Sequence, residues 1–535
     1  MAARGDSYET ESSTPSFTSC ESPTAGIKDD IATTGEGMDD DIITQQLSLL
    51  MQHATTDQLS EINTAPLFTY PVLKHAQRLA TSTSAPPFSQ YGLLAGDAQS
   101  LQPKSSDDPR IFYNVATPSS VFICGSQGSG KSHTLSCILE NCLIQSDKLG
   151  CLPHPLTGIV FHYDDYASDS RVNPCEAAYL GSDPAITVRV LCSPTNIRVI
   201  KDSYSELDHV TVEALRLDQT DLNTKRMLEL MAFDKTQPLY AQVIQRILRD
   251  MRLAQQEKQT PFNYHEFIQK LEGERLSPDQ WRGLRQRLDT LQSFMVPGQV
   301  NPSGNHKRGV RLGTNWMPRA GELLIVDLSC PCVTTSMACA LFNICLSIFL
   351  AQDSSLGRII ALDEAHRYMG ETADSEVLTN SLLSAIRFQR HLGARIVIST
   401  QEPTISPRLL DLCSITIVHR FSSPDWLSVL TKHLAGISKV AKVTTQAGSM
   451  GIDDQEAGRH GFHGILVSPD DPILDLFRQI VELHTGEALV FAPSAMVSLD
   501  HRGLKARPRK LAHHVLRVFM RGRITADGGR SIMAS

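Results

Sequence analysis

The sequence lacks the short cysteine spacings that hold structural metals. Its 12 cysteines are scattered along 535 residues without a CxxC pair, and no group of cysteines and histidines has metal-ligand spacing. Scattered cysteines of this kind are typical of a reducing compartment. We therefore expect no structural zinc.

The sequence also lacks a secretion leader and a long apolar run. No positively charged segment followed by apolar residues opens the chain, so we expect no secretion. The most apolar segment, residues 333–351, contains Ser336, Asn343 and Ser347, which predicts a buried helix rather than a membrane span. These absences predict a soluble intracellular protein, in the nucleus or cytoplasm, with no membrane partner.

A uniform basic charge, which would indicate nucleic-acid binding, is missing too. The formal net charge is −8, and it is unevenly distributed. Residues 1–106 carry 13 acidic and 5 basic side chains, whereas residues 500–535 carry 9 basic and 2 acidic ones. The basic C-terminal segment has three open interpretations: it binds a nucleic-acid phosphate backbone, it is a nuclear localisation signal, or it is a solvated tail.

Composition divides the chain into segments. The acidic, Ser/Thr-rich residues 1–106 have little periodic apolar content, which predicts disorder. One exception is residues 42–51, whose apolar side chains share a helical face and either dock on a protein partner or form a transient helix. The predicted organisation is a disordered tail (1–106), a first core segment (107–204), a helical insertion (205–300), a second core segment (301–499) and a basic tail (500–535).

Short apolar runs alternate with helical segments from about residue 107, which predicts an α/β fold with a mainly parallel sheet covered by helices. In the insertion, Ser277 and Gln280 form a capping-box pattern, and the apolar residues Trp281, Leu284 and Leu288 follow at helical spacing. The predicted strands are residues 121–124, 158–162, 186–191, 323–327, 359–362, 396–399, 415–418 and 488–491.

Residues 125–132 read Gly-Ser-Gln-Gly-Ser-Gly-Lys-Ser, between a predicted strand and a helical segment. Glycines allow a tight loop whose amide groups point at a triphosphate, and the helix directs its positive end at the same anion. Lys131 can reach the outer phosphates, and the Ser132 hydroxyl can bind Mg²⁺. The predicted nucleotide-binding residues are Gly125, Ser126, Gln127, Gly128, Ser129, Gly130, Lys131, Ser132 and His133, and the predicted cofactors are ATP and Mg²⁺.

A second motif is the apolar strand at 359–362 that ends in two carboxylates. At the carboxyl end of a parallel strand, Asp363 can hold Mg²⁺ through water, opposite Ser132. Glu364 can orient and deprotonate the attacking water. Together with the phosphate loop, this pair favours ATP hydrolysis over passive binding.

Another buried strand ends at Gln401, whose amide is placed to sense the γ-phosphate or to cap the next turn. Arg387, Arg390 and Arg420 are further candidates, because a guanidinium can neutralise charge that develops at an active site, in the same chain or across a subunit boundary.

The ordered motifs resemble those of the HerA/FtsK superfamily of ring-forming P-loop ATPases. The resemblance implies an extra strand between the two nucleotide motifs, Glu364 as catalytic base, Gln401 as sensor and Arg390 as the arginine of an arginine-rich helix. It also implies hexamers that translocate DNA or sometimes protein. The motifs that carry it are GSQGSGKS (125–132), GELLIVDLS (321–329), IIALDEAHRYM (359–369), RFQRHLG (387–393), ISTQEP (398–403) and ITIVHRFSSPDW (415–426).

Other nucleotide-dependent classes fit less well. The Asp-Glu-Ala-His tetrapeptide also occurs in RNA helicases, but those place it far closer to the phosphate loop. The Leu-Ser-Gly-Gly signature of transporter ATPases and the Asn-Lys-x-Asp base reader of GTPases are absent. Two functions remain, an ATP-driven motor that translocates or remodels DNA, and a nucleotide-gated interaction protein that hydrolyses ATP slowly without a nucleic-acid substrate.

Overall fold

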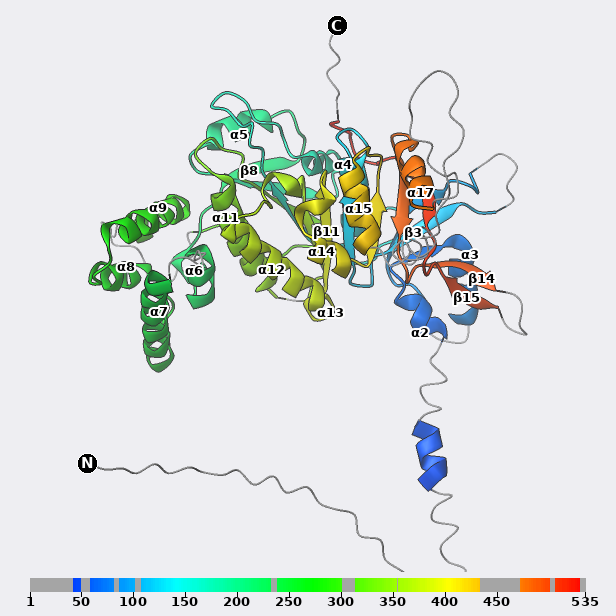
Figure 1. Cartoon of the computed structure of the whole chain (residues 1–535), viewed down its shortest axis with the longest axis horizontal. Coiled ribbons are helices and arrows are strands. Elements are labelled where there is room, and N and C mark those ends of the chain that lie inside the picture. The colour runs from blue at the N-terminus through cyan, green and yellow to red at the C-terminus, as the bar shows by residue number, and fades with distance from the viewer. Residues whose placement is uncertain are drawn as a thin grey trace, which may run out of the picture. The chain divides into compact units, whose positions relative to one another are not determined.

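The computed structural model describes residues 42–49, 58–80, 86–101, 107–231, 238–300, 313–353, 355–433, 472–500 and 506–529. By its internal contacts the chain divides into two units, Met1–Asp57 and Gln58–Ser535. In the first unit, residues 42–49 form a helix whose side chains are all exposed (Figure 1). This confirms a helix in the predicted segment, but its last two positions and the predicted disorder of residues 1–41 lie outside the described part of the chain.

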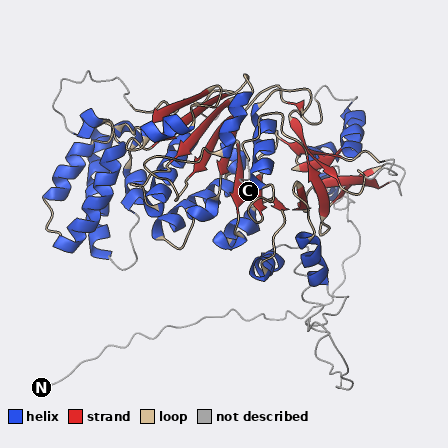
Figure 2. Ribbon diagram, turned by 90° about the horizontal axis from the view of Figure 1, so that it is seen from above, coloured by secondary structure: helices blue, strands red, loops and turns tan. Residues whose placement is uncertain are grey.

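The second unit contains eight neighbouring parallel strands. Figure 2 draws the strands in red and the helices that pack around them in blue. Most of their residues are buried because helices cover both faces, which explains the continuous apolar runs in the sequence. In spatial order the strands are β12 (Ile415–Val418), β4 (Ser120–Cys124), β11 (Ala394–Thr400), β10 (Arg358–Leu362), β6 (Thr157–His162), β9 (Glu322–Asp327), β7 (Thr187–Cys192) and β8 (Val210–Ala214).

The sheet continues beyond β12 in mostly antiparallel strands, so the fold is α/β with a large, mixed and largely parallel sheet. Seven of the eight predicted strands lie in the parallel part, and the eighth is β13. The continuation is β13 (Glu487–Phe491), β16 (Leu516–Met520), β2 (Tyr91–Asp97), β3 (Arg110–Asn114), β1 (Leu67–Thr69), β14 (Met496–Asp500) and β15 (Arg507–Lys510), with β5 (Gly150–Cys151) beside β2.

These additional strands correct the two predicted tails. Residues 58–80 and 86–97, which the sequence assigned to a disordered segment, contain α2 (Gln58–Asn63), β1, α3 (Tyr70–Ala80) and β2. The aromatic rings of Phe68, Phe88 and Phe112 stack in the core that holds them. Residues 507–520 likewise form β15 and β16 rather than a tail. The strands of both segments pair with partners far away in the sequence, so a local pattern does not reveal them.

Two apolar cores lie on the two faces of the parallel strands. Side chains alternate between them along each strand, so Ile360 faces one core and Ile359 the other. The helix α4 (Lys131–Leu143) packs in the second core, and α11 (Thr335–Leu350) and α12 (Ala373–Arg387) pack in the first. The predicted buried helix at 333–351 is thus confirmed as α11. Within the described residues, no helix has both the length and the apolar character needed to cross a membrane.

The predicted helical insertion begins later than residue 205, because residues 210–214 form β8 and pair with β7. Its capping box is confirmed, since Ser277 and Gln280 exchange hydrogen bonds between side chain and backbone. Leu284 and Leu288 are buried, as predicted. The insertion helices are α6 (Thr224–Met231), α7 (Pro238–Lys258), α8 (Tyr264–Glu272), α9 (Pro278–Phe294) and α10 (Pro297–Val300), shown in green in Figure 1.

Shorter helical segments connect the sheet strands, and several of them carry residues of the site described below. They are η1 (Glu176–Ser182), α5 (Ile197–Ser203), η2 (Gln219–Asp221), η3 (Ala365–Arg367), α13 (Gln389–Leu392), η4 (Pro403–Ile405), α14 (Pro407–Leu412), α15 (Pro424–His433) and α17 (Pro472–Val481).

Candidate nucleotide site

The sheet register brings the three predicted motifs together at the carboxyl ends of the parallel strands, an edge of the sheet called the nucleotide edge below. Strand β11 lies between β4 and β10, and Thr400 pairs with Cys124 while Ile398 pairs with Leu362. The next residues along these strands are the phosphate loop, Gln401 and the Asp363–Glu364 pair. Since parallel strands end at the same edge, the three motifs share one site.

Three glycines give the phosphate loop its shape. Gly125, Gly128 and Gly130 have φ values of 155°, 72° and 107°, which side-chain-bearing residues rarely adopt. A Cβ on Gly125 would lie 2.7 Å from both the Cβ of His419 and the Oγ of Ser129, so only glycine fits there. The loop leads directly into α4, and its backbone amides therefore lie at the positive end of a 13-residue helix.

Lys131 joins the loop electrostatically to the two carboxylates. Its side chain is buried, and its Nζ donates a hydrogen bond to the backbone oxygen of Ser126 at 3.1 Å. Burial lowers the pKa of Lys131, and the negative charges of Glu364 and Asp363 act against that shift. The ammonium group thus lies within the field of both carboxylates, as a shared phosphate site requires.

Asp363 is buried, and its two carboxylate oxygens differ in whether they have a hydrogen-bond partner. Its Oδ2 accepts a hydrogen bond from the Nδ1 of His162 at 3.2 Å, whereas its Oδ1 has no partner among the described residues. A buried carboxylate oxygen without a partner is costly unless a ligand satisfies it. Carboxylate and hydroxyl oxygens are the donors that Mg²⁺ prefers, so Asp363 and Ser132, in the first turn of α4, fit a magnesium ion.

Glu364 has a strained backbone at the sheet edge. Its φ of 46° and ψ of 47° lie in the left-handed region, which is unfavourable for a residue other than glycine and is often found at functional sites. Each of its carboxylate oxygens lies 3.5 Å from the Nε2 of Gln401, and Oε2 lies 3.4 Å from the Nδ1 of His366. Burial lowers the pKa of His366, and the Glu364 charge opposes this shift. The predicted base and the predicted sensor therefore touch.

His419 was missed by the sequence reasoning, although it directly follows a predicted strand at this edge. Its ring contacts the hydroxyl of Thr134 through Nε2 and the backbone oxygen of Glu487 through Nδ1, both at 2.9 Å. Because a carbonyl oxygen only accepts, Nδ1 carries the proton and Nε2 accepts from Thr134. Burial lowers the pKa of His419 to about 4, so the ring is neutral. His419 ties α4 and the phosphate loop to β12 and β13.

His133 was predicted to bind the nucleotide, and its ring faces the C-terminal segment. Its Nε2 lies 2.8 Å from the backbone oxygen of Arg521. The same segment is held by Glu140 of α4, which accepts hydrogen bonds from Arg521 and Thr525. Only the backbone amide of His133 therefore remains a candidate for phosphate binding.

The three candidate arginines lie at opposite ends of the parallel strands, with Arg387 and Arg390 at the amino ends and Arg420 at the carboxyl ends. Arg387 and Arg390 precede the first residue of β11, whereas Gln401 follows its last residue. A seven-residue strand spans roughly 20 Å, so neither exposed arginine reaches the phosphate loop of its own chain. Arg420 follows β12 at the edge of the loop, and its backbone oxygen accepts hydrogen bonds from the amide and hydroxyl of Ser126.

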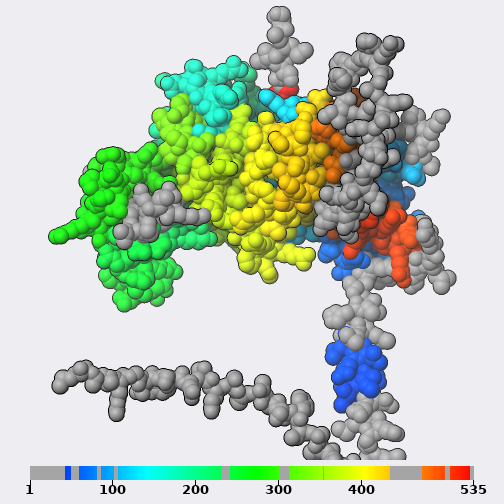
Figure 3. All heavy atoms as spheres, viewed as in Figure 1, coloured from blue at the N-terminus to red at the C-terminus, as the bar shows by residue number. Residues whose placement is uncertain are grey.

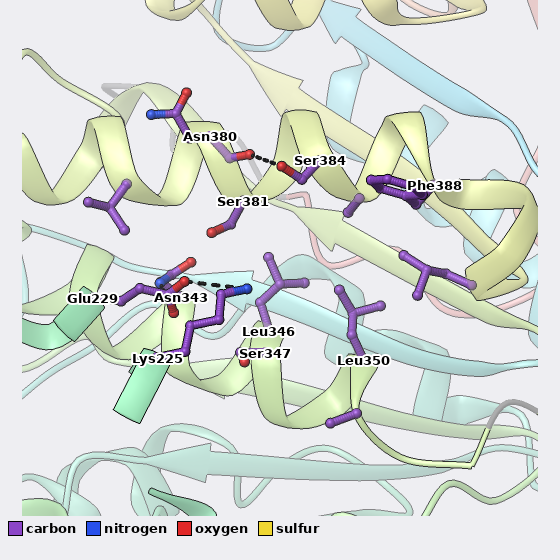
Figure 4. Close-up of a pocket in the computed structure, with 14 residues that line it drawn as sticks. Lys225, Glu229, Asn343, Leu346, Ser347, Leu350, Asn380, Ser381, Ser384 and Phe388 are labelled. Atoms are coloured by element: carbon purple, nitrogen blue, oxygen red, sulfur yellow. Dashed lines mark hydrogen bonds and ion pairs between the residues drawn. The ribbon is translucent and has the colours of Figure 1, made fainter. Parts of the chain in front are cut away.

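A cavity of about 560 Å³ lies between α6, α11, α12 and α13 (Figure 4). Asn343 donates a hydrogen bond to Glu229 at 3.0 Å inside it, and the exposed ring of Phe388 lines it as well. No residue of the phosphate loop lines this cavity, so it is separate from the nucleotide site.

No family model and no curated protein matches the chain. Among solved structures, VirB4 of Thermoanaerobacter pseudethanolicus aligns at 10% identity over 81% of this chain and 96% of that one, with a TM-score of 0.42. The plasmid coupling protein TrwB in complex with ADP and Mg²⁺ aligns at 14% identity over 83% and 98%, with a TM-score of 0.40. The genome packaging NTPase B204 from Sulfolobus turreted icosahedral virus 2, in complex with ATP-gammaS, aligns at 8% identity over 70% and 92%, with a TM-score of 0.26.

The identities to these three solved structures are 14% or lower. Because all three TM-scores lie below 0.5, this likeness carries no weight for the role of any residue. The roles proposed below depend on the geometry of the chain itself.

Proposed function

We propose that this chain binds Mg-ATP at the edge formed by β4, β11 and β10 and hydrolyses it. The observation that supports this most strongly is the strand register, which brings the phosphate loop, Gln401 and the Asp363–Glu364 pair to the same end of neighbouring parallel strands although they lie far apart in the sequence. Lys131 and the loop amides bind the β- and γ-phosphates, while Ser132 and Asp363 hold the metal. Mg²⁺, when bound, neutralises charge on the phosphates.

Glu364 acts as the general base in this proposal. Its carboxylate lies at the carboxyl end of β10, where it orients a water molecule toward the γ-phosphate and takes its proton. The Gln401 amide contacts the same carboxylate at 3.5 Å. A γ-phosphate competes for that amide, which makes Gln401 the sensor of the nucleotide state.

We favour a motor of the HerA/FtsK type that translocates or remodels DNA as a homo-oligomer, a hexamer by resemblance. The order of the sequence motifs supports this assignment. The position of Arg387 and Arg390 also agrees with it, since these arginines serve a phosphate site only if that site belongs to a neighbouring subunit. In such a ring Arg390 supplies the charge in trans, whereas Arg420 acts at its own loop.

One observation favours the alternative of a nucleotide-gated interaction protein. The basic C-terminal segment is the concentrated basic feature of the sequence, but its described arginines are largely paired within the chain. Arg517 contacts Glu487 at 2.8 Å, Arg521 contacts Glu140 at 2.6 Å and Arg523 contacts Glu176 at 2.7 Å. These arginines serve the fold, which weakens the interpretation of this segment as a grip on DNA.

The two functions differ in how DNA affects turnover. We expect ATP hydrolysis to rise with duplex or single-stranded DNA and to lose that stimulation steeply with salt, because phosphate contacts release counterions. The assay is phosphate release across a salt series, beside a sizing measurement with and without ATP. The Lys131→Ala chain is the control for contaminating activity. Turnover that is indifferent to DNA at every salt concentration would contradict the motor and support the interaction protein.

A further inference from the structure

Three potential metal ligands meet next to the nucleotide site. His162 is the last residue of β6 and Asp363 follows β10, and the two are neighbours because Leu362 pairs with Phe161. Cys175 immediately precedes η1. The His162 Nδ1 lies 3.2 Å from the Asp363 Oδ2, and the Cys175 Sγ lies 3.7 Å from the same oxygen. Their donor atoms all lie within 4.8 Å of one another, and all three residues are buried.

These separations match the edges of a tetrahedral metal site. With Zn–N and Zn–O distances near 2.1 Å and a Zn–S distance near 2.3 Å, tetrahedral angles place nitrogen and oxygen roughly 3.4 Å apart and sulfur and oxygen roughly 3.6 Å apart. The observed separations of 3.2 Å and 3.7 Å differ from these values by about 0.2 Å or less. Two of the three separations thus match such a site, and the third, between the His162 nitrogen and the Cys175 sulfur, is within 4.8 Å.

The surrounding structure holds the ligands in place. The hydroxyl of Tyr204 accepts a hydrogen bond from the backbone amide of Cys175 at 2.8 Å and donates one to the Oδ2 of Asp327 at 2.6 Å. The backbone amide of Asp363 donates to the backbone oxygen of Phe161 at 3.0 Å. Such outer contacts orient metal ligands and raise affinity.

We infer that His162, Cys175 and Asp363 form a site for a thiophilic divalent cation such as Zn²⁺, with the fourth position open. Sulfur selects zinc over magnesium and calcium. On binding, the S–H bond of Cys175 breaks as the sulfur–metal bond forms, and the proton leaves to solvent. One thiolate and one carboxylate then balance the two positive charges, with a neutral imidazole as third ligand, so no net charge is buried. No short Cys/His spacing reveals this site, because its ligands come from distant parts of the chain.

The site has a consequence that depends on the proposed function. Asp363 supplies Oδ2 to this cluster, and the same carboxylate supplies Oδ1 to the magnesium site. A zinc ion on Oδ2 places a second divalent charge beside the magnesium position, so it weakens Mg-ATP binding by charge repulsion and inhibits hydrolysis.

Metal binding is tested on the metal-free, reduced full chain without nucleotide. We expect Co²⁺, used as a spectroscopic probe, to bind one ion per chain with a thiolate-to-cobalt charge-transfer band, and Zn²⁺ to displace it. Cys175→Ser should lose the band, and His162→Gln should weaken binding by more than about 10-fold, since even outer contacts are worth that much. The controls Cys151→Ser and Cys332→Ser remove exposed thiols and should keep the band. A band that persists in Cys175→Ser would overturn the site.

A second measurement avoids variants that fail to fold. X-ray absorption of the wild-type chain with one equivalent of Zn²⁺ should show one sulfur and one imidazole in the first shell, and a shell without sulfur would overturn the site. Hydrolysis of Mg-ATP should fall with Zn²⁺ in the wild type and less so in Cys175→Ser. A chain that binds the probe metal but never hydrolyses ATP would contradict the proposed function alone, because metal binding is measured without nucleotide.

Discussion

Replacement of Glu364 by glutamine separates binding from hydrolysis. Glutamine has nearly the same shape as glutamate, so it fits the left-handed backbone and the partly buried surroundings of this position. Folding should therefore change little. The change removes the charge and the basic oxygen. A positioned general base contributes about 10²- to 10⁴-fold to the rate, so kcat should fall by that factor, which corresponds to about 3 to 5 kcal/mol in the barrier.

ATP affinity should stay equal or become tighter in this variant, because the carboxylate that faces the phosphates no longer repels them. Phosphate release at saturating Mg-ATP gives kcat, and a fluorescent ATP analogue gives Kd. Glu371→Gln is the matched control, since Glu371 is an exposed glutamate nearby on the same connection, and it should behave as the wild type. An unchanged kcat in Glu364→Gln would mean that another residue is the base, and a tenfold weaker Kd would make Glu364 a binding group instead.

Three further predictions concern the loop, the C-terminal segment and acid stability. Lys131→Ala should abolish measurable ATP binding, with a loss of at least 10-fold because a charge-assisted hydrogen bond contributes about 1.5 to 3 kcal/mol; calorimetry that gives a wild-type Kd would refute the loop assignment. Glu140→Gln should lower the free energy of unfolding in urea by about 3 to 5 kcal/mol, since Arg521 and Arg523 lose a buried partner; a loss under 1 kcal/mol would contradict that role. The pKa of His419 is about 4 in the folded chain, below the ordinary value near 6.5. The unfolded chain therefore binds more protons between these two pH values, and the free energy of unfolding should fall by about 3 kcal/mol as the pH drops from about 6.5 to 4. The pH slope of the unfolding free energy should be smaller in His419→Gln, and an equal slope would exclude this source.

The parallel part of the sheet was predictable because its strands are buried on both faces. The strands that became β4, β10, β11 and β12 are continuous apolar runs, and each ends in a polar residue or a glycine at the carboxyl edge. Gly125, Asp363 and Gln401 follow three of them, so a single rule about parallel strands predicted the shared site. The local sequence reveals these strands because a strand buried on both faces is a continuous apolar run, without alternating polar residues.

The antiparallel part was not predictable in the same way. Strand β1 has three residues and depends on β3 and β14, and β16 pairs with β13 and β2 from the far end of the chain. Short strands of this kind are stabilised by distant partners rather than by their own pattern. The assignment of the basic C-terminal arginines to a tail was wrong for the same reason, since a local charge count does not reveal a buried partner such as Glu140.

Two histidines show a similar limit within the site. His162 and His419 lie at strand ends of the nucleotide edge, and their positions in the sequence could have indicated this. Their roles depend on which groups their rings meet, which are Asp363 in one case and Thr134 in the other. The contact of the His133 ring with the C-terminal segment likewise could not be predicted from the local sequence.

The most direct test of the account is a crystal structure of the chain with Mg²⁺ and a non-hydrolysable ATP analogue. We expect the γ-phosphate to lie between the Lys131 ammonium and the Glu364 carboxylate, with the metal held by Ser132 and, through water, by Asp363. Phosphates bound elsewhere, or a Glu364 carboxylate that opens onto a different cleft from the loop, would contradict it.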